Sequence, residues 1–208
     1  MSPITLISAD EHLELRITPS YLRQIMMNHV PQESHKSLFD LYYEDAIKGD
    51  ASKQYALAQL YEKGKEIAKD LDQAISWYIK SAENNFSSAQ YRLGQLYYNG
   101  FGIEQNYEKA FYWYKKAAEQ GHADAQFDLG WLYCQSKGVE QDLKKVFYWW
   151  EKAAEQGHAD AQFDLGRLYR HSKDHTLGEK YVKAVYWLEK AAEQGHAKAQ
   201  VLLREFKL

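Results

Sequence analysis

The chain has 208 residues, of which 45% are hydrophobic and 26% are charged, so it is long enough to bury a substantial core. Its formal net charge of −3 gives no general reason to expect binding to nucleic acid or to an anionic membrane surface. The single cysteine, Cys134, excludes an intrachain disulfide, and no stretch approaches the roughly 20 apolar residues of a membrane span. The first residues also lack the basic and apolar regions of a signal peptide. We therefore expect a soluble, cytoplasmic protein without a nucleic-acid or membrane partner.

Residues 1–36 do not follow the periodicity of the rest of the chain. Apolar and polar residues alternate over residues 12–18, which indicates a strand that needs a partner for its backbone groups. Thr18 and Pro19 are typical of a helix start, and the helix that follows must end before Pro31. Its apolar face would consist of Leu22, Ile25 and Met26. We expect residues 1–36 to cap the first repeat, and the alternative is an arm that pairs with a partner or with a second copy.

From residue 37 onward the chain is a repeat array. The segment AAEQGHADAQFDLG occurs at residues 117–130 and again, 36 residues later, at 153–166. The related segment AAEQGHAKAQVLLR follows after a further 38 residues, at 191–204. A period of this length is typical of stacked supersecondary units. The predicted divisions are a half unit at 37–49, units at 50–85, 86–121, 122–157 and 158–195, and a terminal helix within 196–208.

Each unit contains two amphipathic segments. The first has Ala, Leu, Leu and Tyr at positions i, i+4, i+7 and i+8, as in Ala125, Leu129, Leu132 and Tyr133. The second has a small residue, Trp, an aromatic residue or Leu, and two more small residues, as in Ala110, Trp113, Tyr114, Ala117 and Ala118. Both patterns place the apolar residues on one face of a helix. A unit is therefore predicted to be a helical hairpin that must stack on its neighbours to bury that face.

Glycine and cap residues mark the ends of the predicted helices. The residues expected to take positive φ where the second helices end are Gly49, Asn85, Gly121, Gly157 and Gly195. Side-chain acceptors begin three of the second helices, at Asp70, Asn106 and Asp142. The equivalent position in the fourth unit is Lys180, which cannot accept a hydrogen bond. The connection at 171–180 is therefore predicted to be the least regular of the array.

Three glycines lie in the middle of predicted first helices, at Gly94, Gly130 and Gly166. Glycine in a helix interior costs roughly 1 kcal/mol relative to alanine. We therefore expect each of these glycines to permit the close approach of a neighbouring helix. Arg204 replaces this glycine in the last helix, which is expected if no further hairpin packs there.

Units of about 36 residues with A-x-A-Q-x-x-L-G-x-L-Y followed by W-Y-x-K-A-A-E-Q-G resemble Sel1-like repeats, which are relatives of the tetratricopeptide repeat. The resemblance covers residues 37–208, with departures at Lys53, Ala58, Ser136 and Ser172. It implies an all-α fold, an α-solenoid of stacked helical hairpins in a right-handed superhelix. Such proteins usually act as protein-binding scaffolds without catalysis. A cysteine-rich branch of the family carries a disulfide in each repeat, and a single cysteine places this chain outside that branch.

The first helices of such stacked hairpins line the concave face, so a partner should contact the first-helix residues that the apolar stripe leaves free. These predicted partner-binding residues are Tyr55, Gln59, Tyr91, Gln95, Tyr98, Phe127, Trp131, Phe163, Arg167, Arg170 and His171. Four of them, Tyr55, Tyr91, Phe127 and Phe163, form an aromatic ladder along the array. Amides flank this ladder toward its N-terminal end, and positive charge flanks it near Arg167 and Arg170. This pattern predicts a peptide or partner helix with an apolar spine and an acidic end. The alternative is that the ladder residues pack between adjacent first helices.

The sequence offers little support for catalysis, and we predict no metal and no cofactor. His122, His158 and His196 recur with the turn, and neighbouring repeats separate them by about 10 Å. One metal ion cannot bridge that distance with ligand bonds of about 2 Å. Cys134 has no local catalytic signature, so we expect an inert thiol.

Two functions of different classes are consistent with these observations. The first is a non-enzymatic adaptor or scaffold that holds one protein partner on the concave face. The second is an immunity or inhibitor protein, because bacterial Sel1-like proteins include partners that neutralise a cognate toxin by occluding its active site. A neighbouring toxin gene, or the rescue of cells from a toxin, would favour the second function over the first.

Overall fold

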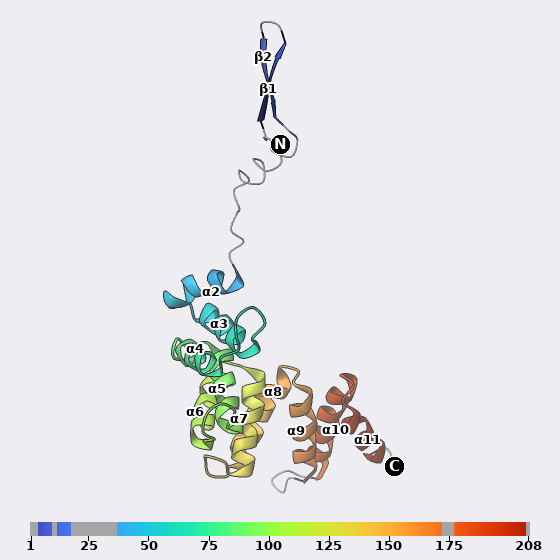
Figure 1. The fold of residues 1–208 in the computed structure, drawn as a ribbon. Helices are drawn as coiled ribbons and strands as arrows, with labels where there is room; N and C mark the ends of the chain where they lie inside the picture. The colour runs from blue at the N-terminus through green and yellow to red at the C-terminus, as the bar shows by residue number, and fades with distance from the viewer. Residues whose placement is uncertain (1–3, 10–11, 18–36, 172–176, 207–208) are drawn as a thin grey trace. The chain divides into compact units, whose positions relative to one another are not determined.

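The computed structural model describes residues 4–9, 12–17, 37–171 and 177–206 (Figure 1). The chain divides into an N-terminal unit and a helical unit, and each is described by itself.

The N-terminal unit contains a two-stranded antiparallel sheet. Strand β1 (Ile4–Ala9) pairs with β2 (His12–Ile17), so that Ile4 lies opposite Ile17. The alternating residues that indicate a strand lie in β2, and β1 is the partner that the sequence pattern left unidentified. The helix expected after Pro19 lies outside the described residues. The capping role of residues 1–36 therefore stays a prediction.

The helical unit, in its described residues, contains ten helices, and each packs on the helices that precede and follow it in the chain. Their bounds are α2 (Leu38–Ile47), α3 (Ala51–Lys63), α4 (Leu71–Glu83), α5 (Ser87–Asn99), α6 (Tyr107–Glu119), α7 (Ala123–Gln135), α8 (Leu143–Glu155), α9 (Ala159–His171), α10 (Leu177–Glu193) and α11 (Ala197–Phe206). After α2, first helices (odd numbers) alternate with second helices (even numbers). Figure 1 shows the helices following one another along the array from α2 to α11 in chain order. The architecture is an α-solenoid of stacked helical hairpins.

The predicted turn and cap residues take the expected conformations. All five residues expected at positive φ have it, from 64° at Asn85 to 101° at Gly49. The side chains of the predicted caps each accept a hydrogen bond from a backbone N–H three residues later, at 2.9 Å for Asp70, 2.8 Å for Asn106 and 3.1 Å for Asp142. Both sets of predictions are confirmed, because turns and caps depend on local sequence alone.

The predicted start of the last second helix is wrong. Helix α10 begins at Leu177 and runs through Lys180, so it has 17 residues where α4, α6 and α8 each have 13. Lys180 has no side-chain acceptor that would cap a helix beginning after it, so the helix extends further toward the N-terminus. Glu179 in this extra turn is favourable, because a carboxylate stabilises a helix N-terminus. Helix α10 is therefore extended at its N-terminus relative to the other second helices, and residues 172–176 of the connection lie outside the described residues.

The mid-helix glycines permit the close helix contacts that their position predicts. A Cβ atom on Gly94 would overlap the ring of Tyr114, and one on Gly130 would overlap the indole of Trp150. At Gly166 the neighbour is Leu188, whose Cγ lies 2.8 Å from the ideal Cβ position. Tyr114, Trp150 and Leu188, on the second helices α6, α8 and α10, thus lie directly over a glycine of the preceding first helix.

A glutamine in each first helix links three consecutive helices. Gln126 in α7 is 4% exposed, and its Nε2 donates to the carbonyl of Ala118 in α6 at 3.1 Å. Its Oε1 accepts from Nε2 of Gln156, just after α8, at 2.7 Å. The same pair of contacts recurs at Gln90 and Gln162. Because a buried amide without partners costs about 1–3 kcal/mol, these paired glutamines fix the spacing of successive hairpins.

The core runs along the array between the first and second helices. Four of its fully buried leucines occupy one register position of successive first helices, Leu57, Leu93, Leu129 and Leu165. Burying each such side chain stabilises the fold by about 1.5–3 kcal/mol. Among the described helices, none combines the length and the apolarity that crossing a bilayer requires.

Candidate functional site

The aromatic ladder, Tyr55, Tyr91, Phe127 and Phe163, packs within the array. Each ring lies against the ring that begins the next first helix. The centroid distances are 5.3 Å from Tyr55 to Phe86, 4.6 Å from Tyr91 to His122, 4.6 Å from Phe127 to His158 and 4.5 Å from Phe163 to His196. The four ladder rings are half-buried, and these contacts favour packing between first helices as the main role of the ladder.

The recurring histidines are helix caps. Nδ1 accepts from the backbone N–H three residues later, at 3.4 Å for His122, 3.1 Å for His158 and 3.2 Å for His196. Nε2 of His158 also lies 3.3 Å from Oδ1 of Asp124 in the preceding first helix. Burial lowers the pKa of His122, which favours the neutral ring that the cap requires. These histidines therefore serve the packing of one hairpin on the next.

Trp131 is half-buried and belongs partly to the packed interior. Its ring lies 5.4 Å from Trp150 and 6.3 Å from Phe127, both in edge-to-face arrangements. The equivalent residues of the adjacent repeats are Gln95 and Arg167, which are polar. At this position of the repeat, one first helix thus carries a packed aromatic ring and its two neighbours carry polar side chains. A substitution at Trp131 therefore disturbs packing as well as any partner contact.

The predicted amide and tyrosine positions toward the N-terminal end make polar contacts. Oε1 of Gln95 accepts from Nη1 of Arg92 at 3.0 Å, and the Tyr98 hydroxyl lies 2.9 Å from Nζ of Lys137. Gln59 is half-buried beside Tyr55. These side chains are only partly exposed and are held in place by their neighbours.

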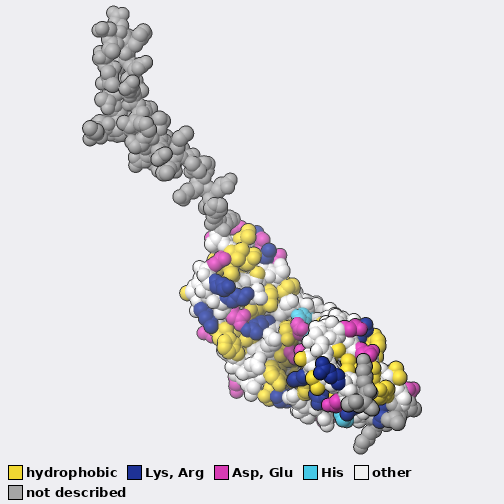
Figure 2. Space-filling view, turned by 90° about the vertical axis from the view of Figure 1, so that its right-hand side faces the viewer, with side chains coloured by type: hydrophobic (Ala, Val, Ile, Leu, Met, Phe, Trp, Pro, Cys, Tyr) yellow, Lys and Arg dark blue, Asp and Glu magenta, His cyan; other side chains and the backbone are white. Residues whose placement is uncertain are grey.

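The predicted positive end is balanced by carboxylates. Arg167, Arg170 and His171 are exposed on α9. Nη1 of Arg167 lies 3.2 Å from Oδ1 of Asp164, and Nη1 of Arg170 lies 3.5 Å from Oε2 of Glu205. On the face shown in Figure 2, basic and acidic side chains are interspersed among hydrophobic ones. The local charge is therefore mixed rather than uniformly positive.

Asp128 is a polar residue of the first helices that the sequence analysis did not select. It follows the ladder residue Phe127, and the hydroxyls of Tyr91 and Tyr114 hydrogen-bond its carboxylate. Burial raises the pKa of this carboxyl to about 6. The residue after the ladder position is charged in three repeats, Arg92, Asp128 and Asp164, and comparison of the copies at that position could have identified it.

Cys134 is half-buried on α7. Burial raises the pKa of its thiol, and Asp164 acts in the same direction. A raised pKa reduces the thiolate fraction that nucleophilic chemistry requires.

A pocket of about 370 Å³ lies between α9 and α11. Phe163, Ala197, Val201 and Leu202 supply its apolar lining. The charged groups come from Arg167, Lys198 and Glu205. Val201 occupies the ladder position of the last helix and is 58% exposed. Two predicted partner-binding residues, Phe163 and Arg167, are thus brought together in one cavity.

Comparisons with solved structures place this architecture among known helical repeats. A protective antigen present in uropathogenic Escherichia coli strains is 38% identical over 77% of this chain and 34% of its own, with a TM-score of 0.72. A Sel1 repeat protein from Oxalobacter formigenes is 32% identical over 85% of this chain and 50% of its own, with a TM-score of 0.75. The chain thus spans about a third and a half, respectively, of these two structures.

An immunity protein from Pseudomonas aeruginosa shares the fold at 24% identity and a TM-score of 0.50, over 96% of this chain and 74% of its own. Comparison with curated proteins gave no match. The family model for the Sel1 repeat matches residues 54–86, 87–122, 123–158 and 159–196. Together with the stacked hairpins, these four consecutive matches show that the chain belongs to the Sel1 repeat family.

Proposed function

We propose that this protein is a non-enzymatic scaffold that binds a protein or peptide partner on its first-helix face, the surface that carries the eleven predicted partner-binding residues. Sel1 repeats generally mediate protein–protein interactions. The observation that carries the proposal is the pocket between α9 and α11. Its lining combines apolar side chains with charged groups, which is the composition of protein interfaces, where an apolar centre is accompanied by polar groups.

The charges of this pocket favour a partner with an acidic group beside an apolar side chain. Arg167 and Lys198 line it together with one carboxylate, Glu205. A carboxylate of the partner would meet two cations, one of which is a guanidinium suited to bidentate hydrogen bonding. An apolar side chain of the partner would cover Val201 and Leu202.

Affinity capture with a matched pair of variants tests the proposal. Val201→Asp combined with Arg167→Glu places negative charge in the pocket, whereas Val182→Asp makes the same substitution at a 65% exposed valine of α10. We expect a partner that the wild type and Val182→Asp capture from the native cell, and that the pocket variant binds at least about tenfold more weakly, a loss of about 1.4 kcal/mol. Equal capture by all three proteins would place the partner elsewhere.

The same experiment separates a scaffold from an inhibitor. If the captured partner is an enzyme or a toxin, its activity is measured with and without the purified Sel1 repeat protein. Suppression that disappears in the pocket variant supports the inhibitor role, and unchanged activity in the bound complex supports the scaffold.

A further inference from the structure

The second helices carry a row of exposed tyrosines that the packing of the array does not require. Tyr112, Tyr148 and Tyr186 are 50%, 52% and 50% exposed. Each is followed by a tryptophan whose ring lies edge-to-face with it, at centroid distances of 4.9, 4.8 and 4.9 Å. An adjacent Tyr–Trp pair therefore recurs once per repeat on α6, α8 and α10. Exposed aromatic residues at a regular spacing are a candidate binding surface.

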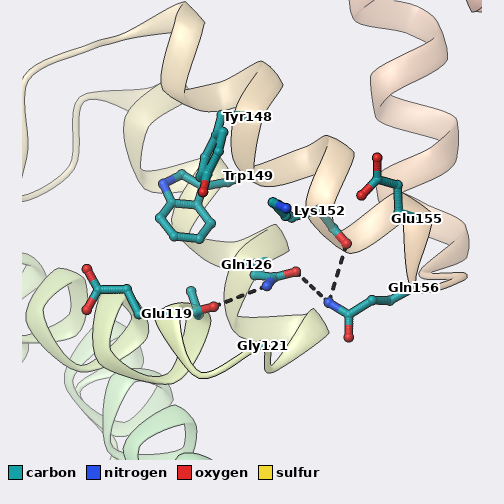
Figure 3. Close-up of a pocket in the computed structure, with 9 residues that line it drawn as sticks. Glu119, Gly121, Gln126, Tyr148, Trp149, Lys152, Glu155 and Gln156 are labelled. Carbon is teal, nitrogen blue, oxygen red and sulfur yellow. Dashed lines mark hydrogen bonds between the residues drawn. The ribbon is translucent and has the colours of Figure 1, made fainter.

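One of these pairs borders a groove of about 500 Å³, the second-helix groove (Figure 3). Tyr148 and Trp149 of α8 form one wall. The rest of the lining comes from Ala118, Glu119, Gly121, Gln126, Lys152, Glu155 and Gln156. In Figure 3 the rings lie above Gln126, which is joined to Gln156 by the 2.7 Å hydrogen bond. The volume is within the range of small-ligand sites.

The groove offers hydrogen-bond donors, acceptors and aromatic faces together. Glu119 and Glu155 supply acceptors, and Lys152 supplies donors. Gln156 supplies a further acceptor, Oε1, because its Nε2 already donates to Gln126 and to the carbonyl of Lys152. A purely apolar ligand would desolvate the two carboxylates without giving them partners, which is costly. A polyanion would meet two carboxylates and one lysine. A neutral polyhydroxyl ligand suits the two carboxylates, the lysine and the Gln156 Oε1 together, because each hydroxyl both donates and accepts, and its C–H faces can cover the rings.

The same residue types stand at the equivalent positions of two further repeats. One set is Glu83, Gln90, Tyr112, Trp113, Lys116 and Gln120. The other is Glu155, Gln162, Tyr186, Trp187, Lys190 and Gln194. The amide pairs Gln90–Gln120 and Gln162–Gln194 are formed at 2.6 and 2.7 Å, as in the second-helix groove. A ligand made of repeating units would therefore meet the same chemistry in successive repeats, which strengthens binding through linked contacts.

We propose that the second-helix face, meaning the second-helix groove and its two sequence equivalents, binds a neutral oligosaccharide. The sugar rings stack on the tyrosine and tryptophan faces, and their hydroxyls bond the glutamates, lysines and glutamines. This site is separate from the first-helix face and does not depend on the proposed protein partner.

Titration of the full chain with cellohexaose, chitohexaose and maltohexaose tests the proposal, with calorimetry and tryptophan fluorescence as readouts. We expect at least one hexasaccharide to bind and to change the fluorescence. Tyr148→Ser should weaken that binding by up to about tenfold, the equivalent of one aromatic contact. The triple variant Tyr112→Ser, Tyr148→Ser, Tyr186→Ser should abolish it.

Two controls distinguish a built site from nonspecific contact. Phe101→Ser removes an aromatic residue of similar exposure, 49%, that does not line the groove, and it should bind the sugar as the wild type does. Val201→Asp, in the pocket of the first-helix face, should also bind the sugar normally. Helix content of every variant is checked by circular dichroism. The proposal is overturned if none of the hexasaccharides binds, or if the triple variant binds as tightly as the wild type.

Discussion

At the scale of single residues, Asp128 is a carboxyl group whose charged form is disfavoured by burial in the array. Burial raises its pKa from 3.8 to about 6, and the nearby Asp124 carboxylate also raises it. The tyrosine hydroxyls act in the opposite direction, because they donate hydrogen bonds to the charged form. Burial prevails, so the folded protein binds the Asp128 proton more tightly than the unfolded chain does.

This difference predicts a pH dependence of stability. Because the pKa of Asp128 is higher in the folded state, the stability that this difference contributes to the fold is fully present below about pH 3.8 and is lost as the pH rises through about 6. Asp128→Asn removes this dependence. Relative to the wild type, the variant should therefore gain about 2–3 kcal/mol in unfolding free energy between pH 4 and pH 7.

Urea denaturation of both proteins across that pH range measures the effect. Glu104→Gln, at an exposed loop position, serves as the control and should follow the wild-type profile. Parallel profiles for the wild type and Asp128→Asn would show that the carboxyl group is more hydrated than its surroundings indicate.

At the scale of the secondary-structure elements, a mid-helix glycine sets how closely two helices pack. An exposed Gly→Ala substitution in a helix normally stabilises, because it reduces the entropy of the unfolded chain. At Gly130 the added Cβ would overlap the Trp150 indole, whose Nε1 donates to the carbonyl of Phe127 at 3.1 Å. Relieving that overlap must shift the ring or the helix.

Gly130→Ala is therefore expected to destabilise the fold by about 1–3 kcal/mol despite its better helix propensity. The matched substitution Gly178→Ala lies in α10, where nothing is within 4 Å of the new Cβ. It should instead stabilise by about 0.4–1 kcal/mol. Thermal denaturation of both variants checks the opposite signs, and a stabilising Gly130→Ala would contradict the close-packing role.

At the scale of the whole molecule, the array has no central core, because each helix packs mainly on its sequence neighbours. Stability in such arrays is approximately a sum of repeat and interface contributions, so the ends open more easily than the middle. Among the described helices, α2 and α11 stand at the two ends, so each has a sequence-neighbouring helix on one side only, α3 and α10 respectively. We expect native-state amide exchange to be slowest in α5–α8 and fastest in α2 and α11. Uniform protection along the array would indicate one cooperative unit.

The array also has two surfaces of different chemistry. The first-helix face combines half-buried aromatic rings with paired charges and ends in the pocket between α9 and α11. The second-helix face presents exposed tyrosines beside amides and carboxylates. The two proposed partners, a protein and an oligosaccharide, would therefore bind through separate residues.

The sequence by itself determined the helical hairpins, the positive-φ turns, three of the caps and the close approach at the mid-helix glycines. These features follow from local chemistry: a helical period, a cap acceptor, or a residue tolerant of positive φ acts within a few residues. The pattern missed the start of α10 for the same reason: it places Lys180 before the helix, because Asp70, Asn106 and Asp142 stand there in the other units, whereas the helix begins at Leu177. The pattern also gave no partner for β2.

Only the tertiary structure decided what the surface residues contact. Three of the ladder rings contact histidines that begin the next first helix, and Asp128 contacts tyrosines of two other helices. The carboxylate beside Arg170 belongs to α11, and the one beside Arg167 lies one turn earlier in the same helix. The recurring letters of AAEQGHADAQFDLG proved to be caps, turns and amide links between hairpins. Which side chains remain exposed, such as Tyr148, depends on how one hairpin covers the next, and the sequence pattern of a single unit does not contain that information.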